Sequence, residues 1–164
     1  MLATLTGNAQ TCFAEPEEQT PLTAFALQTA KDDGHKHPYL LVGIIKVESD
    51  AGASSSYRVV KQGLSTFYGA AQLTIGAAKD VMKRFPDLWN GFNTRTDEEL
   101  KARLILDDKF NVQVASKYLL IMGVNRNPDK GVAAYNVGLG GVELINYQTH
   151  GYTLKVKQAA RKGI

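Results

Sequence analysis

Glu48 is the residue of this 164-residue chain whose type and position best suit acid–base chemistry. It lies at the end of "YLLVGIIKVES" (39–49), an apolar stretch that predicts a buried helix with Pro38 near its first turn. Ile44 and Ile45 precede Glu48 by four and three residues and therefore share its helix face. Burial on that face would raise the pKa of the carboxyl group, and a carboxyl that stays protonated near neutral pH can act as a general acid. The alternative is a helix-terminal Glu whose side chain turns out to solvent.

The other residues that often carry chemistry give weaker patterns. His35, His37 and His150 lack the spacing of a recognised metal site, and no thiol or carboxylate motif joins them. We therefore expect turn or solvated histidines, no metal and no cofactor. Cys12 is the single cysteine, which excludes an internal disulfide and is compatible with either a cytoplasmic or an exported protein.

The composition is that of an ordinary globular domain, with 44% hydrophobic and 21% charged residues. A net charge of +3 with scattered basic residues argues against a nucleic-acid partner. The longest apolar run, "YLLVGII" (39–45), is far too short to span a membrane. The start of the sequence has no signal-peptide pattern. Residues 1–21 are polar with two prolines, which predicts an N-terminal arm before a single domain over 22–164.

The elements that must position Glu48 are mostly helical. Residues 50–69, rich in Gly and Ser, predict a long ordered loop that holds at most a short strand at "SYRVV" (56–60). The stretch 107–123 carries two apolar stripes, which is typical of an enclosed central helix, and Gly123 suits its C-terminal end. The fold class is therefore mainly α with at most a small β element. Helices are expected over 22–31, 39–49, 70–85, 96–105, 107–123, 128–142 (broken at its glycines) and 152–163.

Four sequence blocks together carry a resemblance to a known family. They are "ES" (48–49), "STFYGAAQL" (65–73), "LDDKFNVQVASKYL" (106–119) and "VAAYNVGLGGV" (132–142). The soluble lytic transglycosylases, a family similar to goose-type lysozyme, have a catalytic Glu-Ser, a Gly-x-x-Gln segment, a helix that opens acidic-x-Phe-Asn, and an Ala-Tyr-Asn-x-Gly block in this order. The resemblance covers about residues 37–156 and implies a lysozyme-like (goose-type) single domain with a substrate cleft.

The resemblance also implies an activity on peptidoglycan glycan strands. Glu48 matches the single acid that protonates the glycosidic oxygen of the β-1,4 bond between N-acetylmuramic acid (MurNAc) and N-acetylglucosamine (GlcNAc). The same Glu then acts as a base on the muramoyl C6 hydroxyl and closes a 1,6-anhydro ring without water, unlike the two-carboxylate glycosidases. A periplasmic, cell-wall or phage-associated location follows from the substrate. The arm would suit attachment to a secretion, conjugation or phage assembly.

Matching the motifs residue by residue gives the first part of a substrate-binding set. Ser49 follows the acid, where its hydroxyl could orient a backbone group or cap the helix end. Gly69 and Gln72 match the Gly-x-x-Gln segment, in which a glycine admits a sugar and an amide bonds its hydroxyl and acetamido groups. The family often has Leu-Met between them, whereas this chain has Ala70-Ala71, so the family's Met wall is missing here or supplied elsewhere.

The distance from Glu48 to Gln72 is several residues longer than in the family, which predicts a longer loop over the cleft. The family has a serine in this segment that contacts the sugar at the scissile bond. Ser65 is the candidate, and the rivals are Ser54, Ser55 and Ser56.

The later blocks complete the substrate-binding set. The Tyr135 hydroxyl is expected near the acid, where it would bond Glu48 or the substrate, while Asn136 would tie the glycine loop that follows. "QTHGYTLKV" (148–156) resembles a degraded Glu-Thr-x-x-Tyr-Val-x-x-Val pattern, in which Tyr152 fits. Gln148 replaces the family's Glu, and an amide can hydrogen-bond a sugar without carrying charge.

Two other functions are compatible with the same residues. A goose-type lysozyme activity would hydrolyse the bond by holding a water for attack. A catalytically weak peptidoglycan-binding module of a secretion system or phage particle would keep the cleft, and the Ala70-Ala71 and Gln148 departures favour it. The intact Glu48 argues against the second alternative.

Overall fold

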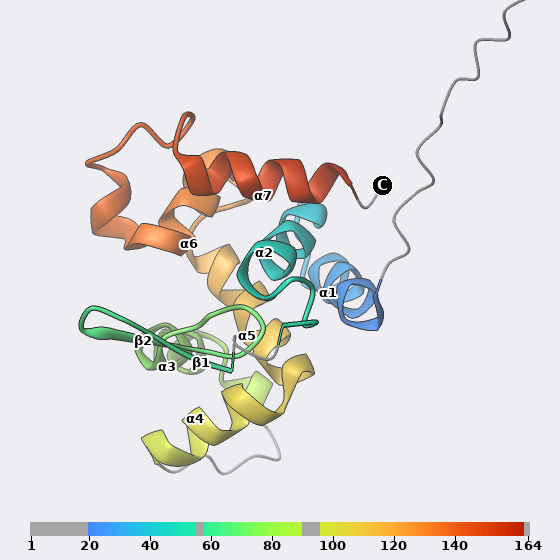
Figure 1. Ribbon diagram of the computed structural model, residues 1–164, viewed down its shortest axis with the longest axis vertical. Helices are drawn as coiled ribbons and strands as arrows, with labels where there is room; N and C mark the ends of the chain where they lie inside the picture. The colour runs from blue at the N-terminus through green and yellow to red at the C-terminus, as the bar shows by residue number, and fades with distance from the viewer. Residues whose placement is uncertain (1–19, 55–57, 90–95, 163–164) are drawn as a thin grey trace, which may run out of the picture.

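The computed structural model describes residues 20–54, 58–89 and 96–162 (Figure 1). Most of the predicted arm, together with Ser55 and Ser56, lies outside the described residues. The structure confirms a mainly helical chain with a small two-stranded sheet. Its elements are α1 (Pro21–Asp32), α2 (Tyr39–Ser49), β1 (Val59–Gln62), β2 (Ser65–Tyr68), α3 (Ile75–Arg84), the 3₁₀ helix η2 (Pro86–Trp89), α4 (Asp97–Leu106), α5 (Asp108–Ile121), α6 (Pro128–Val142) and α7 (Gly151–Arg161).

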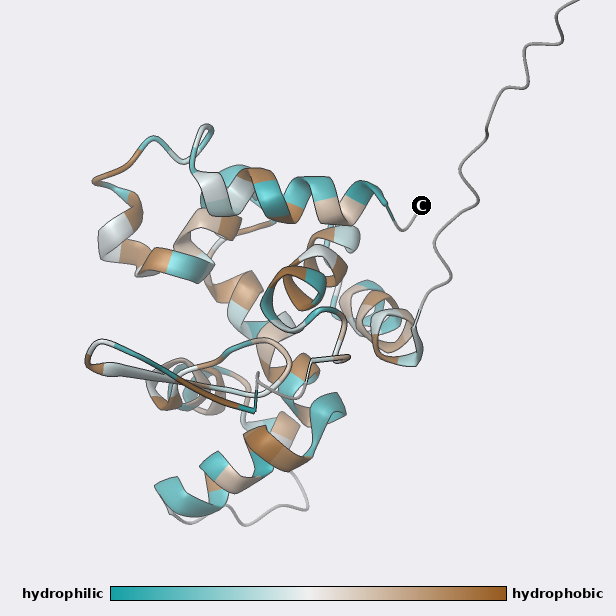
Figure 2. Ribbon diagram, in the orientation of Figure 1, coloured by the Kyte–Doolittle hydropathy of each residue, from teal (hydrophilic) through white to brown (hydrophobic). Residues whose placement is uncertain are grey.

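Helix α5 runs through the middle of the molecule and separates two groups of elements (Figure 1). Helices α2, α6 and α7 lie on one side of it, and the β1–β2 hairpin with α3 and α4 lies on the other. Phe110, Val114 and Leu119 of α5 are buried, as are Val112 and Ala115, so side chains on more than one side of the helix enter the core. The prediction of an enclosed central helix is therefore confirmed, and Figure 2 shows hydrophobic residues on α5 and on α2.

Helix α2 packs closely along α7, and this contact brings distant parts of the chain together. Gly43 makes the approach possible, because a Cβ atom at this position would clash with the backbone carbonyl of Val156. The last turn of α2, which carries Glu48, is thereby held against the start of α7.

Local signals in the sequence account for the helix boundaries. Thr96 and Glu99 form the capping box expected where a Thr is followed by acids. The side chain of each residue accepts a hydrogen bond from the backbone N–H of the other. Asp107 caps α5 by accepting from the Phe110 N–H. Gly123 follows α5 in the left-handed region, with φ 85°, and ends it as predicted.

The segment between α2 and α3 differs from its prediction. Residues 50–69 are not only a loop, because β1 and β2 form an antiparallel hairpin in which Val60 pairs with Phe67. Helix α3 begins at Ile75 rather than at residue 70. Gly69 and Gln72 have φ values of 72° and 51°, which interrupt a helix, and Thr74 supplies the N-cap.

Two further predictions are resolved by the fold. Gly138, with φ 77°, breaks the regular geometry of α6, as its glycines predicted. Of the two alternatives for His35, turn or solvated, the turn holds, because His35 lies between α1 and α2. The ring is buried, with its Nε2 3.0 Å from the Ser116 hydroxyl. Within the described ranges, no helix is long and apolar enough to cross a membrane.

Candidate functional site

Glu48 lies at the wall of a small cavity between α2 and the hairpin. The side chain is half-buried, and the cavity has a volume of about 200 Å³. The expectation of a carboxyl on the apolar side of its helix is confirmed by the burial of Ile44 and Ile45. The described residues that line the cavity are Glu48, Val60, Gln62, Phe67, Gln72, Tyr135 and Asn136.

The environment of Glu48 favours its protonated form. Burial raises the pKa of the carboxyl group above its ordinary value of 4.5. Tyr152 acts against this, since its hydroxyl donates a hydrogen bond of 2.6 Å to Glu48 Oε1 and stabilises the carboxylate. Burial is the larger effect, so the pKa remains raised. The Glu48 carboxyl group therefore has a raised pKa, and the Tyr152 hydroxyl donates a hydrogen bond that stabilises its charged form.

Tyr152→Phe is expected to move the pH dependence of any activity that uses Glu48 as an acid. Removing the hydroxyl removes a bond to the charged form, so the pKa of Glu48 rises further. The limb on which activity falls with increasing pH should then shift to higher pH. Profiles of kcat/KM against pH for the variant and the native chain measure this shift.

Tyr147→Phe is the matched control for that experiment. Tyr147 is also half-buried, but its hydroxyl lies 3.4 Å from the side-chain amide of Asn127 instead of at Glu48. Its pH profile should match that of the native chain. An unchanged or acid-shifted limb for Tyr152→Phe would contradict the assigned role of the hydroxyl.

One face of the hairpin forms a wall that the sequence did not predict. Val60 and Gln62 alternate along β1, and their partners in β2 are Phe67 and Ser65, so all four side chains share one face. Three of them line the cavity at Glu48. Val60, Gln62 and Phe67 are site residues that the motifs missed. The alternation of Val60 and Gln62 along β1, with a period of two residues, is the sequence pattern that could have identified this face.

A second cavity of about 230 Å³ adjoins the first. Phe67, Gln72, Tyr135 and Asn136 line both, so the two cavities form one groove that passes Glu48. The second cavity also contains Ser65, which is exposed. Of the candidate serines, Ser65 is thus on the groove, whereas the described rival Ser54 lines neither cavity.

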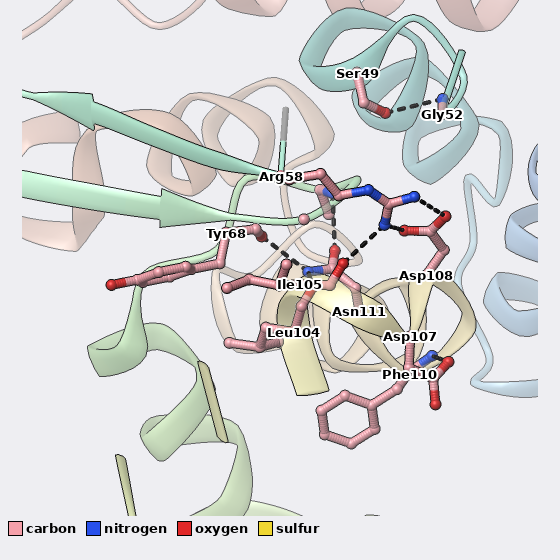
Figure 3. A network of polar contacts seen from close by, with 12 residues as sticks. Ser49, Gly52, Arg58, Tyr68, Leu104, Ile105, Asp107, Asp108, Phe110 and Asn111 are labelled. Atoms are coloured by element: carbon pink, nitrogen blue, oxygen red, sulfur yellow. Dashed lines mark hydrogen bonds and ion pairs between the residues drawn. The ribbon is translucent and has the colours of Figure 1, made fainter. Parts of the chain in front are cut away.

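Asn111 holds the segment that carries Gln72 (Figure 3). Its side chain is fully buried; the amide nitrogen donates to the carbonyls of Tyr68 and Leu104, and the oxygen accepts from Ala71 N–H. All three distances lie between 2.8 and 3.0 Å. One side chain therefore pairs three backbone groups and fixes the turn between β2 and α3 on α5.

The predicted role of Gly69 in admitting a sugar is corrected by this packing. Gly69 is buried, and a Cβ atom there would clash with the Leu104 carbonyl and with the Asn111 side chain. The φ angle of Gly69 is also positive, a conformation that favours glycine over residues with a side chain. Gly69 is thus structural, while Gln72, whose amide nitrogen donates to the Gly69 carbonyl at 2.9 Å, faces the groove.

The tyrosine that bonds Glu48 is Tyr152 and not Tyr135, which was expected near the acid. Tyr135 is buried, and its hydroxyl donates to the Ala71 carbonyl at 2.8 Å instead of to Glu48. It still lines the groove, and burial, with the nearby charge of Glu48, raises the pKa of its hydroxyl well above the usual range. The hydrogen bond to the acid comes from Tyr152. Tyr135 therefore forms part of the groove wall and also fixes the position of Ala71.

Ser49 is a structural residue, in agreement with the capping alternative. Only 2% of it is exposed; its hydroxyl donates to the Ile45 carbonyl and accepts from Gly52 N–H (Figure 3). Gln148 is exposed and is not among the described residues lining either cavity, so the structure does not bring it to Glu48. Asn136 is exposed on the groove, and no hydrogen bond ties it to the glycine loop within the described residues.

The charged groups of the groove are few. Glu48 is the single carboxylate among the described residues that line the two cavities. Asp50, two residues later, is exposed and lines a different cavity. Among the described residues, no cluster of three His, Cys, Asp or Glu side chains could hold a metal ion. The arrangement offers one carboxyl group with a raised pKa, surrounded by amides, a hydroxyl and an aromatic ring.

Comparison with known proteins adds no further assignment. No protein-family model matches the chain, and neither a curated protein nor a solved structure matches it.

Proposed function

We propose that this protein is a peptidoglycan lytic transglycosylase that cleaves the β-1,4 bond between MurNAc and GlcNAc. The observation that carries the proposal is the half-buried Glu48, whose pKa is raised, on a groove with no second carboxylate among the described residues. Hydrolysis by the common two-carboxylate routes needs a second acidic group across the bond. Intramolecular attack by a sugar hydroxyl needs only one group that gives and then takes a proton.

The proposed reaction uses Glu48 twice. The protonated carboxyl donates to the glycosidic oxygen, the C1–O bond breaks, and the GlcNAc alcohol leaves. Glu48, now a carboxylate stabilised by the Tyr152 hydroxyl, accepts the proton of the muramoyl C6 hydroxyl. The C6 oxygen bonds to C1 and closes the 1,6-anhydro ring. The enzyme returns to its protonated form, and no water is consumed.

The groove has the side chains that a glycan strand would need. Gln62, Gln72 and Asn136 offer amides that can donate to and accept from hydroxyl and acetamido groups. Phe67 offers an aromatic surface for the apolar face of a sugar ring. Ser65 extends the polar lining into the second cavity. We assign these residues to substrate binding, together with Tyr135.

The wider setting follows from the same proposal. A central helix, a catalytic Glu at the end of a second helix and a small hairpin opposite it agree with a lysozyme-like (goose-type) fold. The substrate would be peptidoglycan glycan strands, and the site of action the periplasm, the cell wall or a phage particle. The reaction as written needs no cofactor.

The products of digestion separate this reaction from a hydrolysis on the same groove. Purified peptidoglycan sacculi treated with the protein in ¹⁸O-labelled water should release fragments that end in 1,6-anhydro-muramic acid, lighter by one water and free of label. Mass spectrometry of the soluble fragments measures both properties. Reducing ends that contain the label would show a hydrolase, and a lack of soluble fragments would favour a binding module.

A further inference from the structure

A second cavity lies apart from the Glu48 groove and has a basic lining. Its volume is about 640 Å³, and it is formed by the start of α1, the end of α2 and the last turns of α7. None of the described residues that line it lines either part of the Glu48 groove. The lining consists of Thr20, Thr23, Lys46, Val47, Asp50, Ala51, Ala53, Lys155, Gln158, Ala159 and Lys162. We refer to it as the lysine groove.

The charge of the lysine groove favours an anionic occupant. Lys46, Lys155 and Lys162 contribute ammonium groups, and Asp50 is the single carboxylate among its described lining residues. Lys155 and Lys162 are exposed, and neither forms an ion pair with a described residue. The N-terminus of α1 adds the positive end of a helix dipole at Thr20.

The chain itself supplies an acidic segment at the edge of this groove. Residues 15–18 read "EPEE", with Glu15, Glu17 and Glu18, and no Lys or Arg occurs before Lys31. Thr20, which lines the groove, follows this segment after one residue, Gln19. Glu15 precedes Thr20 by five residues, a span of at most about 17 Å of extended chain.

We propose that the lysine groove is the docking site of the chain's own acidic segment, residues 15–18. Tethering through Thr20 gives the carboxylates an effective concentration in the groove on the order of millimolar. Several carboxylates facing several ammonium groups form a charge network, which is stronger than one exposed ion pair. The groove wall includes Asp50, Ala51 and Ala53, so docking covers the turn that leads from the Glu48 helix towards the hairpin. The proposal is independent of the enzymatic function, because the two sites share no described lining residue.

The single cysteine permits a direct test in the full chain. A nitroxide spin label on Cys12, eight residues before Thr20, should broaden the amide NMR signals of residues 46–53 and 155–162. This loss of intensity should be stronger than an undocked tether of eight residues gives, and it should fall to that lower level in K155E/K162E and in about 1 M salt, where the screening length falls to roughly 3 Å. E15K/E17K/E18K should show the same lower level, and combining all five substitutions should restore the stronger loss.

The controls distinguish docking within one chain from other occupants. The control is a mixture of isotope-labelled chain without the spin label and spin-labelled chain without the isotope. Its NMR signals should show no broadening. Broadening in that mixture would assign the groove to a second copy of the chain and overturn the proposal. A native chain broadened no more than in about 1 M salt would also overturn it and leave the groove to an acidic segment of another protein. Broadening in K155E/K162E as strong as in the native chain would exclude the lysines as the docking surface.

Discussion

Glu48→Gln is expected to lower the rate of glycan-strand cleavage by about a thousandfold or more. General acid or base catalysis by one group typically contributes about 10² to 10⁴ in rate, and Glu48 is assigned both steps. The substitution keeps the shape of the side chain, and its amide oxygen can still accept the hydrogen bond from Tyr152. Release of soluble fragments from sacculi at pH 6 to 8 measures the loss. Equal rates for the two chains would remove Glu48 from the mechanism.

The stability of the same variant separates lost chemistry from lost folding. Because the pKa of Glu48 is raised in the folded chain, the native protein binds this proton more tightly than the unfolded chain. The resulting stabilisation is complete below the unfolded value of about 4.5 and is lost as pH rises through the folded pKa. Gln has no such loss, so Glu48→Gln should gain stability relative to the native chain as pH increases. Thermal unfolding across that range measures it.

Glu143→Gln is the matched control for removing a carboxylate. Glu143 is exposed and pairs with Lys130 at 2.6 Å, and it lines neither part of the groove. An exposed ion pair contributes little to stability, at most about 1 kcal/mol. Activity and its pH profile should therefore remain those of the native chain. A comparable loss in this variant would show that the assay responds to charge and not to the site.

Asn111→Ala is expected to have the largest effect on stability, about 4 kcal/mol. The substitution removes the partner of the Ala71 N–H and one donor each from the Tyr68 and Leu104 carbonyls, of which the Tyr68 carbonyl still accepts from the Leu73 N–H. A buried group left unpaired costs about 1 to 3 kcal/mol, and each further hydrogen bond lost costs about 1 kcal/mol. The melting temperature should fall by about 10 °C. Activity should fall further than unfolding explains, because the Gln72 turn loses its anchor on α5.

Gln113→Ala provides the comparison on the same helix. Gln113 is half-buried two residues after Asn111 and lines a cavity away from Glu48. Its loss should change the free energy of unfolding by about 0.5 kcal/mol. Denaturant unfolding of both variants, with activity measured where each is fully folded, tests the contrast. Equal destabilisation of the two variants would contradict the role of Asn111 as the anchor.

Much of the helical framework was predictable from local sequence. Thr96 and Glu99 identified the start of α4, and the apolar spacing of 39–49 identified α2 together with the face on which Glu48 lies. These features depend on residues three or four positions apart, whose interactions form within a single helix. The short strand expected at 56–60 overlaps β1, but β2 and the pairing were missed, because strands of four residues in a Gly- and Ser-rich segment have too short a pattern to stand out.

The roles of individual site residues needed more than their motifs. Gly69 and Ser49 matched positions expected at the substrate, but their surroundings make them structural. Gln148 matched a motif as well, yet it lies exposed outside the groove. A motif specifies which residue is present, whereas the function of that residue depends on the neighbours that pack against it.

The sequence by itself determined that this chain is mainly helical and that Glu48 lies on the apolar face of its helix, because both follow from interactions within one helix. Only the tertiary structure decided what surrounds that carboxyl group. The hydrogen bond from Tyr152, 104 residues away, and the hairpin wall opposite Glu48 require segments that meet only after the chain has folded. Long-range packing removes water from Glu48 and raises its pKa, so the property that makes it a candidate acid belongs to the fold.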